Sequence, residues 1–135
     1  MRDGLTRKLE RPPEQDHAFT AWLARWQATL VVVSGAQAGT EYPLEQPRVT
    51  LGRGEDADLV FADSAMSREH AAVEFAGEGF RVRDLGSMNG TLLNGSETKA
   101  GDLKNGDRIE VGEHTFQFVL EKRRKRPKTY VLPEE

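Results

Sequence analysis

Three short polar segments of the sequence carry side chains that together could bind an anion. They are Gly52-Arg53-Gly54, Ser67-Arg68-Glu69-His70 and Ser87-Met88-Asn89-Gly90. Arginine offers planar, bidentate donors to a phosphate, serine adds a short charge-assisted O–H bond, and asparagine can both donate to and accept from a peptide backbone. If the three segments meet in space, they support the binding of an anionic group carried by a peptide.

Short apolar runs lie between these polar segments and have the pattern of β-strands. Residues 58–61, 71–75 and 80–85 form three such runs. The alternation in the last of them predicts that Phe80 and Val82 face a core. Strands that lie side by side in one sheet can bring the turns between them to the same end, where the three polar segments would converge.

The remaining sequence predicts more strands of the same kind. They cover residues 29–33, 41–44, 48–51, 91–93, 108–111 and 114–120. The sequence also contains 13 glycines, several of them in Asn-Gly pairs, which are typical of tight turns. About ten or eleven short strands with no helix between them favour an all-β fold, an antiparallel β-sandwich, over a parallel α/β sheet.

The order and spacing of the three polar segments resemble the forkhead-associated (FHA) domain, a family of β-sandwich modules that bind phosphothreonine peptides. The similarity extends over residues 29–120. It implies that the residues contacting the phosphothreonine peptide are Arg53, Ser67, Arg68, Ser87, Met88 and Asn89. It also implies that Gly52, His70 and Gly90 support the site, with His70 holding the loops of Ser67 and Arg53 in a fixed relation.

Other uses of the same residues stay open at this stage. Arg53 could be an ordinary surface arginine paired with Glu55, Asp56 or Asp58, and a guanidinium locked in that way would argue against an anion site. Asn89-Gly90 is also a common hairpin turn. Short carboxylates in turns tend to accept backbone N–H groups, so Asp58 and Asp84 are expected to cap loops.

The sequence offers little for catalysis or for a cofactor. Ser67 and His70 lack the G-x-S-x-G turn of a serine hydrolase, so no enzymatic activity is expected. There are no cysteines, and neither His17 nor His114 has metal-ligand spacing from His70. We therefore expect no metal and no cofactor. No apolar run reaches the ~18 residues that span a bilayer, and a cytoplasmic protein is expected.

Both ends of the sequence differ from the middle. Residues 1–27 are predicted to be an arm that contains an amphipathic helix over about 16–27, with Asp16 as its N-cap and Phe19, Trp22, Leu23 and Trp26 on one face. That face could pack on the sandwich or bind a partner. Residues 28–121 are the predicted FHA domain. Residues 122–135 are a basic tail that is expected to be disordered and solvated.

These observations lead to a hypothesis and a rival. The hypothesis is an adaptor in Ser/Thr-kinase signalling that recognises phosphothreonine in a partner, either a kinase or a kinase substrate. Thr6 and Thr129 are candidate phosphorylation sites through which the protein could also associate with itself. The rival is an assembly module of the same fold that binds through Trp22 and Trp26 without phosphate. No groove-reading motif accompanies the basic tail, so neither nucleic acid nor a membrane is an expected partner.

Overall fold

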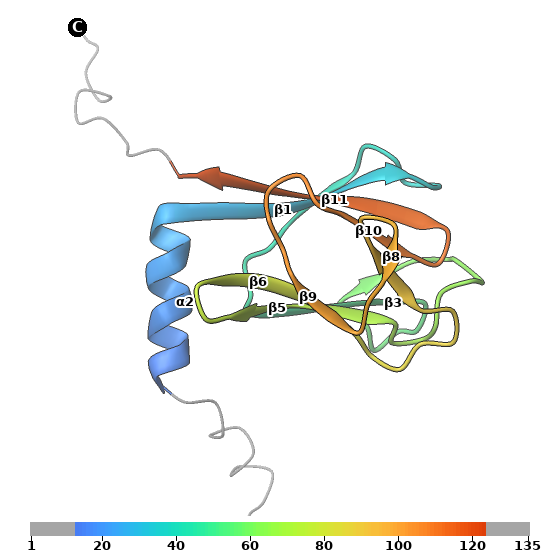
Figure 1. Cartoon of the computed structure of the whole chain (residues 1–135), viewed down its shortest axis with the longest axis horizontal. Coiled ribbons are helices and arrows are strands. Elements are labelled where there is room, and N and C mark those ends of the chain that lie inside the picture. Colours follow the sequence, from blue (N-terminus) through green and yellow to red (C-terminus); the bar gives the residue numbers. More distant parts are fainter. Residues whose placement is uncertain (1–12, 124–135) are drawn as a thin grey trace, which may run out of the picture.

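One N-terminal helix precedes eleven strands in the computed structural model, which describes residues 13–123. The helix α2 spans Pro13–Arg25. The strands are β1 (Trp26–Ser34), β2 (Glu41–Pro43), β3 (Arg48–Gly52), β4 (Leu59–Val60), β5 (Ala71–Ala76), β6 (Gly79–Asp84), β7 (Thr91–Leu93), β8 (Ser96–Glu97), β9 (Ala100–Asp102), β10 (Arg108–Val111) and β11 (His114–Lys122). Figure 1 shows the helix standing across one end of the strands.

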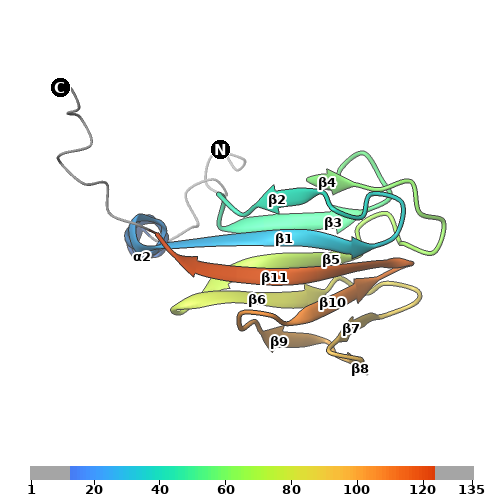
Figure 2. The same ribbon diagram turned by 90° about the horizontal axis from the view of Figure 1, so that it is seen from above.

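The strands form two sheets that face each other. One sheet has six strands in the order β2-β1-β11-β10-β7-β8, and the other has five in the order β4-β3-β5-β6-β9. The strand pairs are antiparallel except β3 with β4. Figure 2 shows the long strands β1 and β11 beside each other along the molecule. The predicted antiparallel β-sandwich of about ten or eleven strands, with a short helix outside it, is confirmed.

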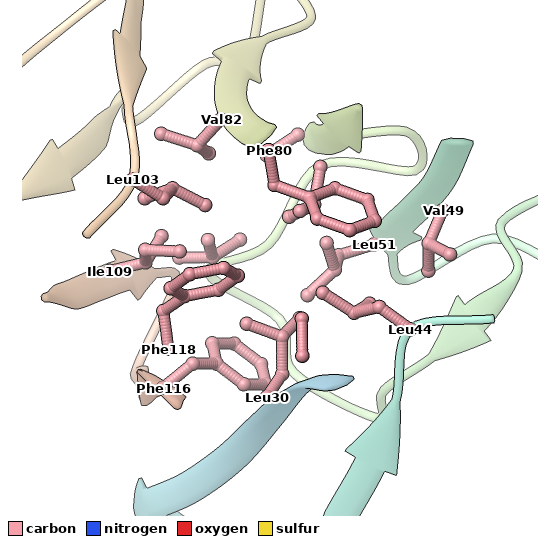
Figure 3. Close-up of a cluster of buried hydrophobic side chains, with 14 of the residues drawn as sticks. Leu30, Leu44, Val49, Leu51, Phe80, Val82, Leu103, Ile109, Phe116 and Phe118 are labelled. Atoms are coloured by element: carbon pink, nitrogen blue, oxygen red, sulfur yellow. The ribbon is translucent and has the colours of Figure 1, made fainter. Parts of the chain in front are cut away.

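Side chains from both sheets fill the space between them. Leu30, Phe116 and Phe118 come from the six-stranded sheet, and Leu51 and Val82 come from the five-stranded one (Figure 3). All five are at most 1% exposed. Burial of each such side chain contributes about 1.5–3 kcal/mol, so this core holds the strand ends, and the loops that leave them, in place.

The aromatic face of helix α2 packs on the end of the sandwich. Phe19 is 6% exposed and Trp22 is 9% exposed. Their rings lie 5.2 and 5.6 Å from that of Phe75, and Phe80 contacts both. Of the two interpretations of this face, packing on the sandwich is therefore the correct one. Most of the surface of Trp22 is covered by this packing.

The bounds of the helix differ from the prediction. It begins at Pro13, three positions before the predicted start, so Asp16 lies inside it and is no N-cap. Proline suits a first helical position because its fixed φ is already helical and its missing N–H would have no intrahelical partner there. Trp26 is not helical either. It starts β1 and pairs with Lys122 of β11.

The C-terminal end of the described chain meets the last turn of helix α2. Arg123 donates its backbone N–H to the carbonyl of Arg25 at 2.7 Å and its Nε to the carbonyl of Leu23 at 2.7 Å. These bonds satisfy carbonyls of the last helical turn, which lack a partner within the helix. The predicted basic tail lies almost wholly outside the described residues. In residues 13–123 no helix has the length and apolar character needed to cross a membrane.

Candidate functional site

Three loops meet at the end of the sandwich opposite helix α2 (Figure 1). They are the β3–β4 loop (residues 53–58), the β4–β5 loop (residues 61–70) and the β6–β7 loop (residues 85–90). Strands β3, β5 and β6 are neighbours in one sheet, so the loops that leave this end of them start side by side. The three polar segments therefore converge at this end of the sandwich, as predicted.

Two glycines let the β4–β5 loop lie directly on the end of β3. Arg53 donates its backbone N–H to the carbonyl of Ser67 at 2.9 Å, and Gly54 donates to the carbonyl of Arg68 at 3.1 Å. A Cβ atom at Gly52 would collide with the carbonyl oxygen of Arg68. The supporting role predicted for Gly52 therefore has a physical basis: the backbone of the facing loop occupies the space that a side chain would need.

The guanidinium of Arg53 is held in place but keeps its charge available. Its Nε donates to the carbonyl of Met66 at 3.0 Å, and the side chain is exposed. Within residues 13–123 it forms no ion pair with Glu55, Asp56 or Asp58. Asp58 instead accepts the backbone N–H of Thr50 at 2.9 Å, as expected of a loop-capping carboxylate. No described residue bonds to the terminal Nη groups of Arg53, which can therefore donate to an anion.

Ser67 connects the second loop to the third. Its Oγ accepts the backbone N–H of Met88 at 3.0 Å. A hydroxyl that accepts one bond still has a proton to donate, so Ser67 can offer an O–H donor beside Arg53. Met88, whose backbone makes this bond, is 86% exposed. Arg68 is exposed as well, on the residue that follows Ser67.

Asn89 is fixed through its amide nitrogen. Nδ2 donates to the carbonyl of Ala65 at 2.8 Å, which leaves Oδ1 to accept from a guest. Asn89-Gly90 does not form a two-residue hairpin, whereas Asn94-Gly95 does, between β7 and β8. The simple hairpin interpretation therefore applies to Asn94-Gly95 and not to Asn89-Gly90.

His70 is completely buried and joins two loops through its ring. Its Nδ1 accepts the backbone N–H of Ser67 at 3.0 Å, and its Nε2 lies 2.7 Å from the carbonyl of Gly90. Because a backbone N–H can only donate, Nδ1 is unprotonated and Nε2 carries the proton. The prediction had this ring joining the loops of Ser67 and Arg53. It instead joins the loop of Ser67 to that of Gly90, and only the backbone N–H of His70 reaches β3, at Leu51.

Asp84 organises the β6–β7 loop from inside. It accepts the hydroxyls of Ser87 at 2.6 Å and Thr91 at 2.7 Å, together with the backbone N–H groups of Gly86 and Ser87. The Oγ of Ser87 accepts the N–H of Gly90 in turn. Ser87 was predicted to contact a ligand. In the structure its hydroxyl donates to Asp84 and accepts from Gly90, so it stabilises the conformation of the loop. Asp84 caps the loop as expected.

These bonds make the stability of the loop depend on pH. Burial opposes the ionisation of Asp84, but the hydrogen bonds from Ser87, Thr91 and the backbone outweigh it and hold the pKa of this carboxyl below its ordinary value. The folded state therefore binds fewer protons than the unfolded state near pH 4. We expect the free energy of unfolding to fall as the pH drops from about 5 through the folded pKa. Urea titrations across this range should show a shallower fall for Asp84→Asn than for Asp102→Asn on edge strand β9.

Some of the predicted residues are not placed, and one buried pair of ionisable side chains was not predicted. Thr6 and Thr129 lie outside the described residues. The sequence indicated only that His114 lacks metal-ligand spacing from His70, and it indicated no role for Asp63. The structure buries both together, with Asp63 in the β4–β5 loop and His114 at the start of β11. No local signal could have revealed them, because they lie 51 positions apart.

Comparison with known proteins agrees with this geometry. The family model for "Inner membrane component of T3SS, cytoplasmic domain" (Yop-YscD) matches residues 31–122. The glycogen accumulation regulator GarA of Mycolicibacterium smegmatis is 38% identical over 92 residues, which are 68% of this chain and 58% of GarA, less than two thirds of that protein. The oxoglutarate dehydrogenase inhibitor of Corynebacterium jeikeium is 33% identical over 121 residues, which cover 88% of this chain and 84% of that one.

Solved structures have the same fold. An FHA domain solved in a structural and functional analysis of phosphothreonine-dependent FHA domain interactions superposes with a TM-score of 0.63 and 30% identity. The superposition covers 69% of this chain and 95% of that one. The chain belongs to the forkhead-associated family.

Proposed function

We propose that this protein is a non-enzymatic reader of phosphothreonine in partner proteins, acting as an adaptor in Ser/Thr-kinase signalling. The observation that carries the proposal is the Arg53 guanidinium, held by a backbone carbonyl and unpaired with the carboxylates near it among the described residues. The comparisons support it, since similar proteins include a regulator, an inhibitor and an FHA domain studied for phosphothreonine-dependent interactions. We place the activity in residues 28–121.

The mechanism follows from the free donors of the site. A phosphothreonine carries about −1.5 to −2 charge and three acceptor oxygens. Arg53 would give bidentate N–H bonds, Ser67 an O–H bond and Arg68 additional positive potential. Asn89 would accept a peptide N–H with Oδ1, which has no donor among the described residues. Because existing hydrogen bonds already fix Arg53, Ser67 and Asn89, little conformational entropy of these side chains is lost when the ligand binds.

A titration with three related peptides tests this function. A degenerate phosphothreonine library first selects a binding sequence. The selected peptide, its phosphoserine twin and its unmodified form are then compared by calorimetry. We expect no measurable heat for the unmodified peptide, and about tenfold weaker binding for phosphoserine, which lacks one methyl group. Equal binding of the modified and unmodified peptides would contradict the proposal.

The rival assembly function finds no support in the helix. Its proposed contact surface was Trp22 and Trp26, but Trp22 is buried against the sandwich and Trp26 pairs within the six-stranded sheet. Trp22 and Trp26 do line a pocket between helix α2 and the sandwich, but only 9% of Trp22 is exposed there, and its ring packs on Phe75 and Phe80. The loop site is therefore the better candidate for recognition.

A further inference from the structure

A buried, hydrogen-bonded pair of a carboxylate and an imidazole lies at the base of the loops of the proposed site. Asp63 is 6% exposed and His114 is 4% exposed, and Nδ1 of the imidazole lies 2.7 Å from Oδ2 of the carboxylate. Nε2 of His114 lies 2.9 Å from Oε1 of Gln37, in the segment between β1 and β2. The ring thus spans from the β4–β5 loop to the β1–β2 segment, and the function proposed above gives none of these three residues a role.

The carboxylate of Asp63 holds the loop that carries Ser67. Its Oδ1 accepts the backbone N–H of Ala65 at 2.9 Å, and its Oδ2 also accepts that of Glu113 at 2.8 Å. Burial opposes the ionisation of Asp63, but the bonds from His114 and from these two backbone groups outweigh it and lower the pKa of the carboxyl. An ionised carboxylate with these partners ties the loop firmly to the turn between β10 and β11.

The backbone fixed in this way positions the proposed ligand-binding side chains. The carbonyl of Ala65 accepts from Asn89, and the carbonyl of the next residue, Met66, accepts from Arg53. Met66 in turn donates its N–H to the carbonyl of Asp63 at 3.0 Å. Hydrogen bonds and the short backbone segment of residues 63–66 therefore connect the buried imidazole to both Asn89 and Arg53.

Gly35, Gly112 and Phe61 pack closely around the side chains of Asp63 and His114. A Cβ atom at Gly35 would lie 2.8 Å from Cδ2 of His114, and one at Gly112 would lie 2.7 Å from Oδ2 of Asp63. The ring of Phe61 lies 4.9 Å from the imidazole. Both glycines have positive φ, so the backbone itself bends around the pair. Such close packing fixes the imidazole and, through it, the loop above.

We propose that Asp63 and His114 are positioning residues of the phosphopeptide site, which set the place of the β4–β5 loop and thereby the affinity of Arg53 and Asn89 for the ligand. Neither residue touches the peptide. The inference rests on the proposed function for its effect on affinity, but its effect on the loop can be measured in the free protein.

Two substitutions of His114 separate positioning from simple packing. His114→Phe keeps a ring in the aromatic cluster and removes both hydrogen bonds. His114→Asn places an amide N–H near the position of Nδ1 and can restore the bond to Asp63. Leu103→Ala serves as a matched control, because Leu103 is 8% exposed and packs near Phe80, beside helix α2 at the other end of the sandwich.

The first measurement needs no ligand. The amide protons of Ser67 and Met88 are hydrogen-bonded to the ring of His70 and to the Oγ of Ser67, so their exchange rates report the order of the site. We expect His114→Phe to speed their exchange about tenfold, His114→Asn to change it less than about threefold, and Leu103→Ala to leave it unchanged relative to global unfolding. Unchanged rates in His114→Phe, or equal acceleration in Leu103→Ala, would overturn the inference.

The second measurement is the Kd of the selected phosphopeptide for the same variants, at a temperature where each is folded. His114→Phe should bind about tenfold more weakly, while His114→Asn recovers most of the affinity. A lowered Tm with an unchanged Kd would mean that the pair only stabilises the fold. If the wild-type protein binds no phosphopeptide, the proposed function fails, whereas the exchange rates still decide whether Asp63 and His114 position the loop.

Discussion

Arg53→Ala is expected to abolish detectable binding of the phosphothreonine peptide while leaving the fold intact. Arg53 supplies the bidentate, charged donors of the site, and its guanidinium is exposed and free of carboxylate partners within residues 13–123. Truncating one partner of a hydrogen-bonded charge pair costs about 2–5 kcal/mol, so the Kd should rise by about thirtyfold to several thousandfold. Titration calorimetry with the selected peptide measures this loss directly.

Two further variants make the result specific. Arg53→Lys keeps the charge but loses the planar fork, so it should recover only part of the affinity. Arg25→Ala removes an exposed arginine side chain from the last turn of helix α2, at the other end of the sandwich, and should bind as the wild type does. If Arg53→Ala retained full affinity, the anion would have to bind elsewhere and the proposed site would be wrong. The loss should also shrink as salt is added, because the interaction is partly screened.

The residues that point toward the proposed ligand were those that the sequence could reveal. Arg53, Ser67 and Asn89 each follow or lie within a polar turn between two strands, and three such turns in a fixed order are a specific pattern. Asp84 was also predictable as a cap, because short carboxylates next to glycine and serine commonly accept backbone N–H groups. Local chemistry was sufficient for these residues.

The errors of prediction came from contacts that no local pattern encodes. Trp26 lies four positions after Trp22, which is helical spacing, but pairing with Lys122 of β11 places it in a strand. The antiparallel partner is almost a hundred residues away, and it overrides the local preference. His70 was expected to reach the loop of Arg53 and reaches that of Gly90 instead, because the position of the β6–β7 loop depends on the register of β5 with β6.

The main chain holds the two side chains that define the site. Arg53 donates to the carbonyl of Met66, and Asn89 donates to the carbonyl of Ala65. A backbone acceptor is present whatever side chain occupies position 65 or 66, so the orientation of both donors depends on the path of the β4–β5 loop. Residues that control this path, His70 from one side and the Asp63–His114 pair from below, therefore control the site without contacting the ligand.

His70→Ala is expected to be the most destabilising change at this end of the molecule. The ring is completely buried, and its removal leaves a cavity, an unpaired N–H on Ser67 and an unpaired carbonyl on Gly90. Together these losses should lower the free energy of unfolding by about 3–5 kcal/mol. Urea unfolding of the variant and of His17→Ala, an exposed histidine on helix α2, measures the difference.

The same variant should also bind the phosphopeptide more weakly when it is folded. Without the ring, the loops of Ser67 and Gly90 lose their direct connection, and Ser67 and Asn89 would have to be ordered again on binding, at a cost of about 0.5–1.5 kcal/mol for each side chain. Peptide titrations at low temperature, below the unfolding transition of the variant, separate this effect from the loss of folded protein. An unchanged Kd there would show that the two loops keep their places without His70, and that strand register alone positions the site.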